Sequence, residues 1–112
     1  SSAASDVYKR QELKNIDLSK ARSIRLYARG NNEKYFIFLR TTGTILPWQY
    51  YSHEFTVNEE YNEFIMHIQD FKKSGSLLAK QINPKKITSI GIVAYGRDHY
   101  AELYVKELEF LE

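Results

Sequence analysis

The sequence predicts an all-β protein, an antiparallel β-sandwich that forms one domain. Six short segments carry the alternation of apolar and polar residues that is typical of strands, and turn signals separate them. The chain has nine tyrosines and six phenylalanines, which are residue types that favour strands. No segment shows the apolar period of a long amphipathic helix. A length of 112 residues suffices for a single hydrophobic core.

The first two predicted strands cover residues 22–29 and 34–41, and Gly30, Asn31 and Asn32 join them. Glycine and asparagine tolerate positive φ, so this junction predicts a hairpin. In the first strand, Ile24, Leu26 and Ala28 share one face. In the second strand, Tyr35, Ile37 and Leu39 lie on one face, and Phe36, Phe38 and Arg40 on the other. The second strand is therefore expected at the centre of a sheet, covered on both sides or lining a groove.

Four more strands are predicted, over residues 48–55, 62–68, 87–95 and 100–110. In the last of them the alternating residues are Ala101, Leu103 and Val105, followed out of phase by Leu108 and Phe110. Such a phase shift indicates a β-bulge. Residues 72–83 read as a polar loop that leads into a short helical turn with Asn83 as its cap and Pro84 in its first position.

Charge and composition exclude several functional classes. Sixteen basic and 14 acidic side chains are intermixed, and a net charge of +2 provides no concentrated field for a nucleic-acid backbone. The chain has no cysteine, which excludes disulfides, thiolate zinc sites and thiol nucleophiles. No apolar run approaches the roughly 20 residues that span a bilayer, so we expect no membrane span in this segment. None of these properties assigns a compartment.

Residues 1–11 are identical to the in-frame translation of a widely used transposon-type sequencing adaptor. We therefore interpret residues 1–11 as a scar that is not native and exclude them from the fold prediction. A scar fused directly to Glu12 implies that native sequence upstream is missing. Residues 12–112 are then expected to be the C-terminal part of a single domain.

The sequence contains no group of residues with the spacing or motif of a catalytic or metal site. The three histidines, His53, His67 and His99, are scattered, and only His67 with Asp70 approaches the spacing of metal ligands. Zinc sites need three or four ligands, so we interpret His67 as a structural or surface histidine. The sequence contains no glycine-flanked serine elbow, no phosphate-binding glycine loop and no cofactor motif. Its carboxylates, among them Glu59, Glu60, Glu102, Glu107 and Glu109, are expected on solvated strand faces, so the domain is interpreted as non-catalytic.

A binding face is the better candidate for a functional site. Its residues are Arg29, Phe38, Arg40, Trp48, Tyr50, Tyr51 and Arg97. Aromatic rings stack on the apolar faces of sugars and arginine grips hydroxyls or carboxylates, but the same residue types also anchor protein interfaces. Core packing is the third interpretation.

For four residues of this set the sequence also predicts an orientation or a partner. Trp48 follows a proline at a strand entrance, which favours packing of its ring against the sandwich. Tyr50 and Tyr51 must point to opposite faces of an extended segment, so one is expected inside and the other available. Arg40 lies among apolar neighbours and needs a partner, for which Glu54 and Asp98 are the candidates.

Several segments in fixed order resemble the complex I intermediate-associated protein 30 family. They are residues 24–30, 35–41, 47–51, 68–71, 87–92 and 103–108, within a similarity that covers residues 19–110. The resemblance implies a galactose-binding-like jelly roll that is incomplete at its N-terminus, since the tryptophan-containing and glycine-rich strands that usually open the family are absent. It also implies non-enzymatic work, because mitochondrial members assist assembly of respiratory complex I and bacterial members are largely uncharacterised.

Together these observations predict a non-catalytic domain that binds a protein partner, as an assembly factor does. A carbohydrate-binding module that uses the aromatic and arginine face is the alternative, because similar jelly rolls serve in that role and fold alone does not choose between them. A sugar site needs exposed aromatic rings on a concave sheet face, whereas an assembly factor needs a broader mixed patch. An accessory domain of a larger enzyme is a third possibility.

Overall fold

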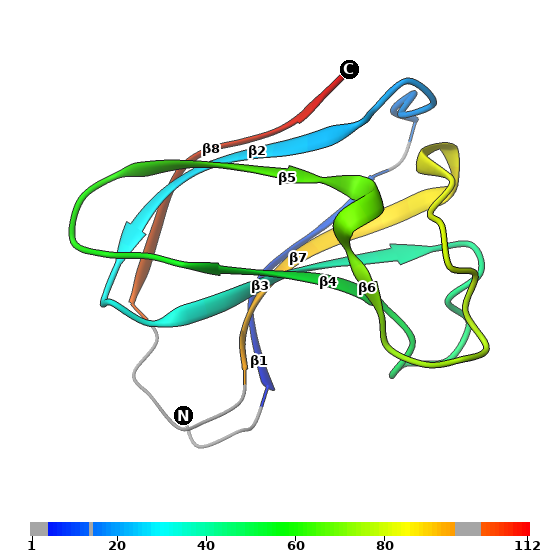
Figure 1. Ribbon diagram of the computed structural model, residues 1–112, viewed down its shortest axis with the longest axis horizontal. Coiled ribbons are helices and arrows are strands. Elements are labelled where there is room, and N and C mark those ends of the chain that lie inside the picture. The colour runs from blue at the N-terminus through cyan, green and yellow to red at the C-terminus, as the bar shows by residue number, and fades with distance from the viewer. Residues whose placement is uncertain (1–4, 14, 96–101) are drawn as a thin grey trace.

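The computed structural model, which describes residues 5–13, 15–95 and 102–112, is a sandwich of two antiparallel sheets (Figure 1). The larger sheet has the strand order β1-β7-β3-β4-β6, and the smaller one has the order β5-β2-β8. The strands are β1 (Ser5–Glu12), β2 (Ser23–Gly30), β3 (Lys34–Thr41), β4 (Tyr51–Thr56), β5 (Asn62–His67), β6 (Lys72–Lys73), β7 (Ile87–Tyr95) and β8 (Leu103–Leu111). Two short 3₁₀ helices, η1 (Ile68–Asp70) and η2 (Pro84–Lys86), complete the described part of the chain. The predicted β-sandwich is confirmed.

The hydrophobic core lies between the two sheets and follows the predicted alternation. From β2 it takes Ile24, Leu26 and Ala28, and from β3 it takes Tyr35, Ile37 and Leu39, all without solvent exposure. The buried hydroxyl of Tyr35 has hydrogen-bond partners. It donates to Asn31 Oδ1 at 2.8 Å and accepts from the Glu102 backbone N–H at 3.0 Å. A buried tyrosine therefore joins the turn after β2 to the approach to β8.

Local features of the sequence predicted several elements closely. Strands β3 and β7 have the predicted bounds. Asn83 caps η2, where its side chain accepts from the Lys85 backbone N–H at 3.1 Å and Pro84 follows at the first position. The expected bulge is present in β8, since Tyr27 pairs with Glu107 and Ala28 with Val105, which leaves Lys106 as the extra residue.

The hairpin predicted between β2 and β3 is wrong. The turn at Asn31 and Asn32 is tight, with φ of 59° at Asn32, but β2 pairs with β5 and β8 whereas β3 pairs with β4 and β7. The turn therefore connects the two sheets across the core. Each strand buries one apolar face, and two such faces can meet as facing layers as readily as they can lie side by side in one sheet.

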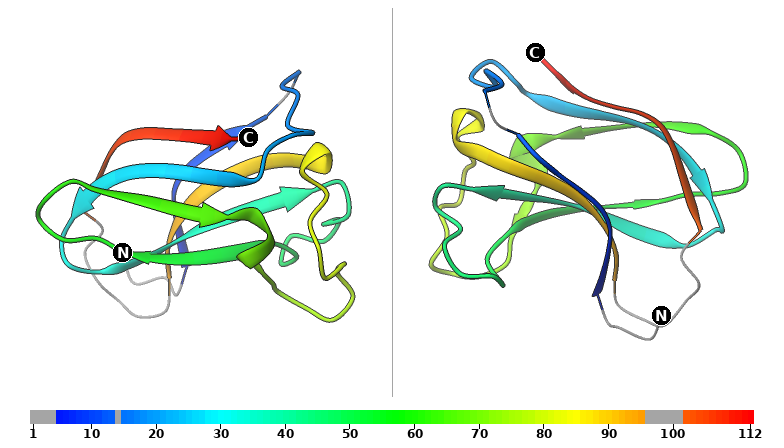
Figure 2. Two further views of the ribbon diagram at one scale, coloured as in Figure 1. Left: turned by 45° about the horizontal axis from the view of Figure 1, so that its top comes forward. Right: turned by 180° about the vertical axis from the view of Figure 1, so that it is seen from behind.

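Two segments excluded from the strand prediction also pair in the larger sheet. Within the predicted loop, Lys72 and Lys73 form β6 beside Ser52 and Tyr51. Within the segment that we interpret as a scar, Ser5–Glu12 forms β1 along β7, as Figure 2 shows from behind. Ladder hydrogen bonds are made by the backbone, so a segment can complete a sheet edge without an apolar pattern of its own.

Candidate functional site

The outer face of the five-stranded sheet carries an aromatic cluster, which we call the aromatic face. Its side chains come from β3, from β4 and from the residue before β4: Phe36, Phe38, Arg40, Tyr50, Ser52 and Glu54. Phe36 and Phe38 alternate with the buried residues of β3, so their rings lie on the solvent side and are half-buried. Gly91 of β7 stands opposite Phe38 and adds no side chain there.

Three rings of the aromatic face form a continuous group. Phe38 and Tyr50 stack with their centroids 4.1 Å apart and an interplanar angle of 11°. Phe36 meets Phe38 edge-on at 6.4 Å and 70°. Pairs in such geometries stabilise one another beyond the area that they bury. The stack leaves Tyr50 half-buried on the outside of the sheet.

Tyr51 points the other way, as the alternation predicted. Its side chain is 3% exposed, and its hydroxyl donates to the Ala79 carbonyl oxygen at 2.7 Å. Burial raises the pKa of the Tyr51 phenol, because it disfavours the charged form. Tyr51 therefore belongs to the core and does not contribute to the aromatic face.

Arg40 holds a loop and not a carboxylate. Its Nη1 donates to the Pro47 carbonyl oxygen at 2.9 Å, and its Nη2 donates to those of Thr44 and Leu46 at 2.8 and 3.1 Å. The predicted pair with Glu54 is wrong, because Glu54 pairs across the ladder with Phe36, at a distance along β3 from Arg40. The alternative partner Asp98 lies outside the described residues.

Glu54 has a different cation as its partner. Lys34 Nζ lies 2.9 Å from Glu54 Oε2, and this ammonium group lowers the pKa of the Glu54 carboxyl through a hydrogen bond and through its charge. Both side chains are more than half exposed, so the pair is screened by solvent. Together with the rings, it makes the aromatic face chemically mixed.

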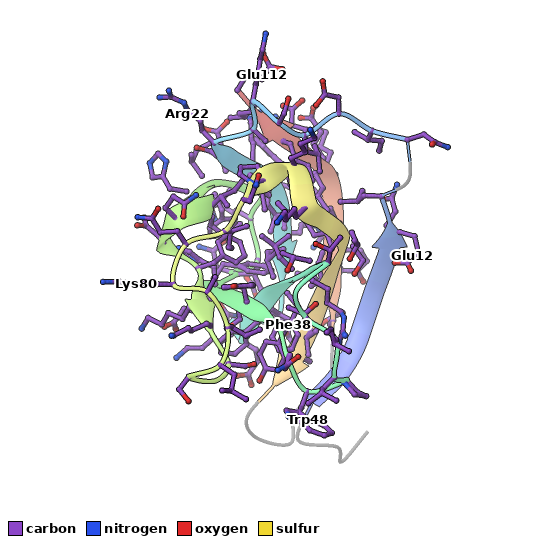
Figure 3. The ribbon with its side chains drawn as sticks, turned by 90° about the vertical axis from the view of Figure 1, so that its right-hand side faces the viewer. Glu12, Arg22, Phe38, Trp48, Lys80 and Glu112 are labelled. Atoms are coloured by element: carbon purple, nitrogen blue, oxygen red, sulfur yellow. The ribbon has the colours of Figure 1, made fainter. Side chains whose placement is uncertain are left out.

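Trp48 lies in the loop that Arg40 holds, and its predicted packing against the sandwich is wrong. The indole is 67% exposed, and Figure 3 shows it pointing away from the sheets. The backbone anchors this residue instead, because the Trp48 carbonyl oxygen accepts from Ser74 Oγ at 3.0 Å. The loop is fixed further by Thr44, 5% exposed, whose hydroxyl donates to the Thr41 carbonyl oxygen at 2.8 Å. With the backbone held in this way, the ring is not needed as an anchor.

The other two predicted site residues do not join this group. Arg29 lies on β2 in the smaller sheet, where its guanidinium stacks over the Tyr104 ring at 4.3 Å and near Tyr61 at 5.5 Å. Arg97 lies outside the described residues. The structure thus brings together Phe38, Arg40 and Tyr50, with Trp48 in the adjoining loop.

A shallow hollow beside Phe36 was missed by sequence reasoning. Its volume is about 280 Å³, and it is lined by Phe36, Ser52, His53, Glu54, Asp70 and Lys72. Ladder register explains the position of Lys72, since β6 pairs it with Ser52. The alternation of β3 already placed Phe36 on the same face as Phe38, but nothing in the sequence showed that β6 would lie beside β4.

The remaining polar residues show structural contacts. His67 is exposed, and its Nδ1 lies 3.0 Å from Ser23 Oγ. On the smaller sheet, Arg25 binds Glu63, Glu107 and Glu109 at 2.6 to 3.3 Å, and the carboxylates of Glu63 and Glu107 raise its pKa. Among the described residues, no three His, Cys, Asp or Glu side chains lie close enough to hold a metal ion. In the same part of the chain, no helix is long and apolar enough to cross a bilayer.

We predict that Arg40→Gln loosens the loop that contains Trp48. Glutamine is too short to reach all three carbonyl oxygens, so the free energy of unfolding should fall by about 1–3 kcal/mol. Urea denaturation measures this loss, and limited proteolysis should place the first new cleavage within residues 42–49. Lys34→Gln removes a cation from the same strand without touching the loop and serves as the control. Unchanged cleavage in Arg40→Gln would contradict the role of Arg40.

Comparisons with known proteins bear on both fold and family. The model of the family described as complex I intermediate-associated protein 30 (CIA30) matches residues 3–104. Among solved structures, the chain is similar to the family 11 carbohydrate-binding module of the cellulosomal cellulase Lic26A-Cel5E of Clostridium thermocellum, with a TM-score of 0.72 and 12% sequence identity. That similarity covers 91% of this chain and 64% of the other, and at this identity it shows the fold alone. No curated protein sequence matches significantly.

Proposed function

Because the chain belongs to the complex I intermediate-associated protein 30 family, we propose that it is a non-catalytic domain that binds a protein partner during assembly of respiratory complex I. This family and the carbohydrate-binding fold are both non-catalytic kinds of domain. We propose the aromatic face as the surface that contacts the partner.

The mixed character of the aromatic face carries this proposal. Half-buried rings at its centre adjoin the exposed pair of Lys34 and Glu54, and this combination of aromatic centre and charged rim is common in protein interfaces. Arg40, which a sugar site would use to grip hydroxyls, already donates to three backbone carbonyl groups. The face therefore suits a broad protein surface better than a single saccharide.

Saccharide binding is the second candidate, and one observation favours it. Phe38 and Tyr50 form a stacked, half-buried pair on the outer face of the larger sheet, and aromatic rings of this kind stack on the apolar faces of sugars. A sugar ring could stack there and place its hydroxyls in the hollow beside Phe36. A saccharide array with the unchanged chain and with Tyr50→Ala tests this alternative.

Site-specific photo-cross-linking tests the protein-binding proposal. A photoreactive residue at Ser52, on the aromatic face, should cross-link to complex I subunits in cells that are assembling the complex. The additional change Tyr50→Ala should lower the yield at least about fivefold, because aromatic anchors dominate binding at interfaces. The same photoreactive residue at Ile65, on the smaller sheet, is the control.

Two results would reject the proposal. One is equal cross-linking of complex I subunits from Ser52 and Ile65, which would show that the aromatic face is not selective. The other is binding of a saccharide on the array that Tyr50→Ala abolishes while the chain stays folded. This result would identify the aromatic face as a sugar-binding site.

A further inference from the structure

Two neighbouring loops expose the most solvent-accessible large apolar side chains of the described residues. We call the end of the sandwich formed by residues 42–49 and 74–83 the loop end; Figure 3 looks onto it. Leu77 is 88% exposed, Ile45 82% and Trp48 67%, and Leu46 adds a fourth apolar side chain at 40%. Large apolar residues concentrated in this way mark a contact surface, whereas single ones need no explanation.

The backbone of the loop end is held in place. Ser74 joins the two loops, because its hydroxyl donates to the Trp48 carbonyl oxygen and accepts from the Tyr50 backbone N–H, both at 3.0 Å. Lys73 Nζ donates to the Leu78 carbonyl oxygen at 3.2 Å, and the buried side chain of Leu78 fixes the second loop beside Leu77. The exposed apolar side chains are thus presented on ordered loops.

The segments that form and flank the loop end carry lysines but no acidic residue. Residues 71–95 contain five lysines and no acidic residue, and residues 41–53 contain no aspartate, glutamate, lysine or arginine. Lys72 and Lys85 have acidic neighbours. The pKa of Glu54 is lowered first by its hydrogen bond to Lys34 and that of Asp17 by hydrogen bonds to Ser19, and the charges of Lys72 and Lys85 add to these effects. Lys80 and Lys86 take part in none of the salt bridges found between described residues. Lys80 points outward in Figure 3.

Lys86 also lines a groove between the two loops. The groove has a volume of about 440 Å³, and Gly43 and Leu77 lie on its walls with Lys86. Apolar tips, a groove and lysines therefore occur at one end of the molecule.

We propose that the loop end docks on an anionic lipid bilayer. Apolar side chains at the tips of loops need no complementary pockets in a fluid acyl layer, whereas a protein partner must supply a pocket for each of them. Tryptophan favours the boundary between headgroups and acyl chains, where its ring is apolar and its N–H is polar. Lys80 and Lys86, which take part in none of the salt bridges found between described residues, can attract anionic headgroups. The inference goes beyond the proposed function and uses a different surface from the aromatic face.

The intrinsic fluorescence of the 112-residue chain provides a direct test, because Trp48 is its only tryptophan. Vesicles of equal parts phosphatidylcholine and phosphatidylserine should shift the Trp48 emission to shorter wavelength and should sediment the protein. Vesicles of phosphatidylcholine alone should do neither. Absence of the shift with the anionic vesicles would overturn the proposal.

Two variants separate the apolar and the charged contributions. Ile45→Ser with Leu77→Ser retains the reporter and should weaken vesicle binding at least about tenfold, because two apolar insertions are lost. Lys80→Glu with Lys86→Glu should also weaken binding at least about tenfold, through repulsion from anionic headgroups. The control is Ile65→Ser, which removes an apolar side chain that is 46% exposed on the other sheet and should bind as the unchanged chain does.

The variants also decide between a bilayer and other acidic partners. All five substituted residues are exposed, so folding should be retained, and circular dichroism checks it; if the Ile45 and Leu77 variant does not fold, Leu77→Ser alone replaces it. Unchanged binding by the serine variant would overturn insertion. An equal emission shift with soluble polyglutamate would assign the surface to an acidic polymer instead. Tyr50→Ala should leave vesicle binding intact, so failure of this proposal and failure of the proposed function are distinguishable.

Discussion

Gly30→Ala is expected to lower the free energy of unfolding by about 1–3 kcal/mol, the range of overpacking in a well-packed interior. Gly30 ends β2 and is buried. A Cβ atom added there would collide with the Glu102 carbonyl oxygen and would lie 2.9 Å from Val57 Cγ2. The carbonyl belongs to the backbone and Val57 is 1% exposed, so neither neighbour can move aside easily.

The position matters because three segments meet at Gly30. Its backbone N–H donates to the Asn58 carbonyl oxygen at 2.7 Å, and it pairs with Leu103 across the ladder to β8. A shift of Gly30 would therefore disturb the crossing from β4 to β5 and the start of β8 together. Glycine is required here for close approach of the backbone.

Urea denaturation of Gly30→Ala measures the loss. Gly75→Ala is the matched control, because nothing lies within 4 Å of a Cβ added at Gly75. The control should change the free energy of unfolding by no more than about 0.5 kcal/mol. If the two substitutions changed the free energy of unfolding equally, crowding at Gly30 would not contribute to the stability of the domain.

The sequence predicted the strands better than their partners, and β2 and β3 show why. Alternation is a local property, so Ile24 and Leu26 in β2, like Ile37 and Leu39 in β3, could be assigned to the core side from the sequence. Pairing joins residues that are far apart in the chain, and a turn sequence such as Asn31-Asn32 serves a crossing between sheets as well as a hairpin. The pairing of the strands therefore could not be predicted from the local alternation of apolar and polar residues.

The candidate site was predicted in part for the same reason. Alternation placed Phe38 on the face of β3 opposite its core residues and put Tyr50 and Tyr51 on opposite faces, but it did not show which of the two tyrosines lies inside. Arg40 was correctly expected to need a partner, but carbonyl oxygens of a loop carry no signal in the sequence. Trp48 was predicted to pack because the loop was expected to need an anchor, and the structure uses Arg40 and Ser74 for that purpose.

Residues 1–11 raise a separate question, which is their origin. We propose that they are a scar, because they are identical to a translated sequencing adaptor. Genomic DNA of the source that carries the same codons, read without library preparation, would reject this proposal. Pairing along β7 does not depend on the origin, since the ladder is formed by the backbone.

Deletion of residues 1–11 is expected to destabilise the domain further than any single substitution above. Strand β1 pairs with β7 from Ser5 to Glu12, and each ladder hydrogen bond contributes about 0.5–1.5 kcal/mol net. Loss of several such bonds should lower the free energy of unfolding by about 3 kcal/mol or more. Since each kcal/mol shifts the Tm by about 4–8 °C in a domain of this size, the Tm should fall by at least about 12 °C.

The deletion should also make the protein aggregate. Without β1, strand β7 becomes an edge that offers unpaired N–H and C=O groups beside a run of apolar residues, and such an edge pairs with other chains. Differential scanning calorimetry and light scattering at several protein concentrations measure both effects. An unchanged Tm and unchanged scattering would show that β1 does not support the sandwich in solution.

A variant with residues 1–11 in permuted order separates backbone pairing from side-chain packing. In the present register Lys9 pairs with Ile92 and Gln11 with Ile90, so two polar residues of β1 stand opposite apolar residues of β7, although Val7 pairs with Val93. If the ladder alone holds β1, the permuted variant should keep most of the stability that the deletion loses. A permuted variant as unstable as the deletion would instead show that specific side chains of this segment pack against the sheet, and β1 would then be part of the fold through its sequence.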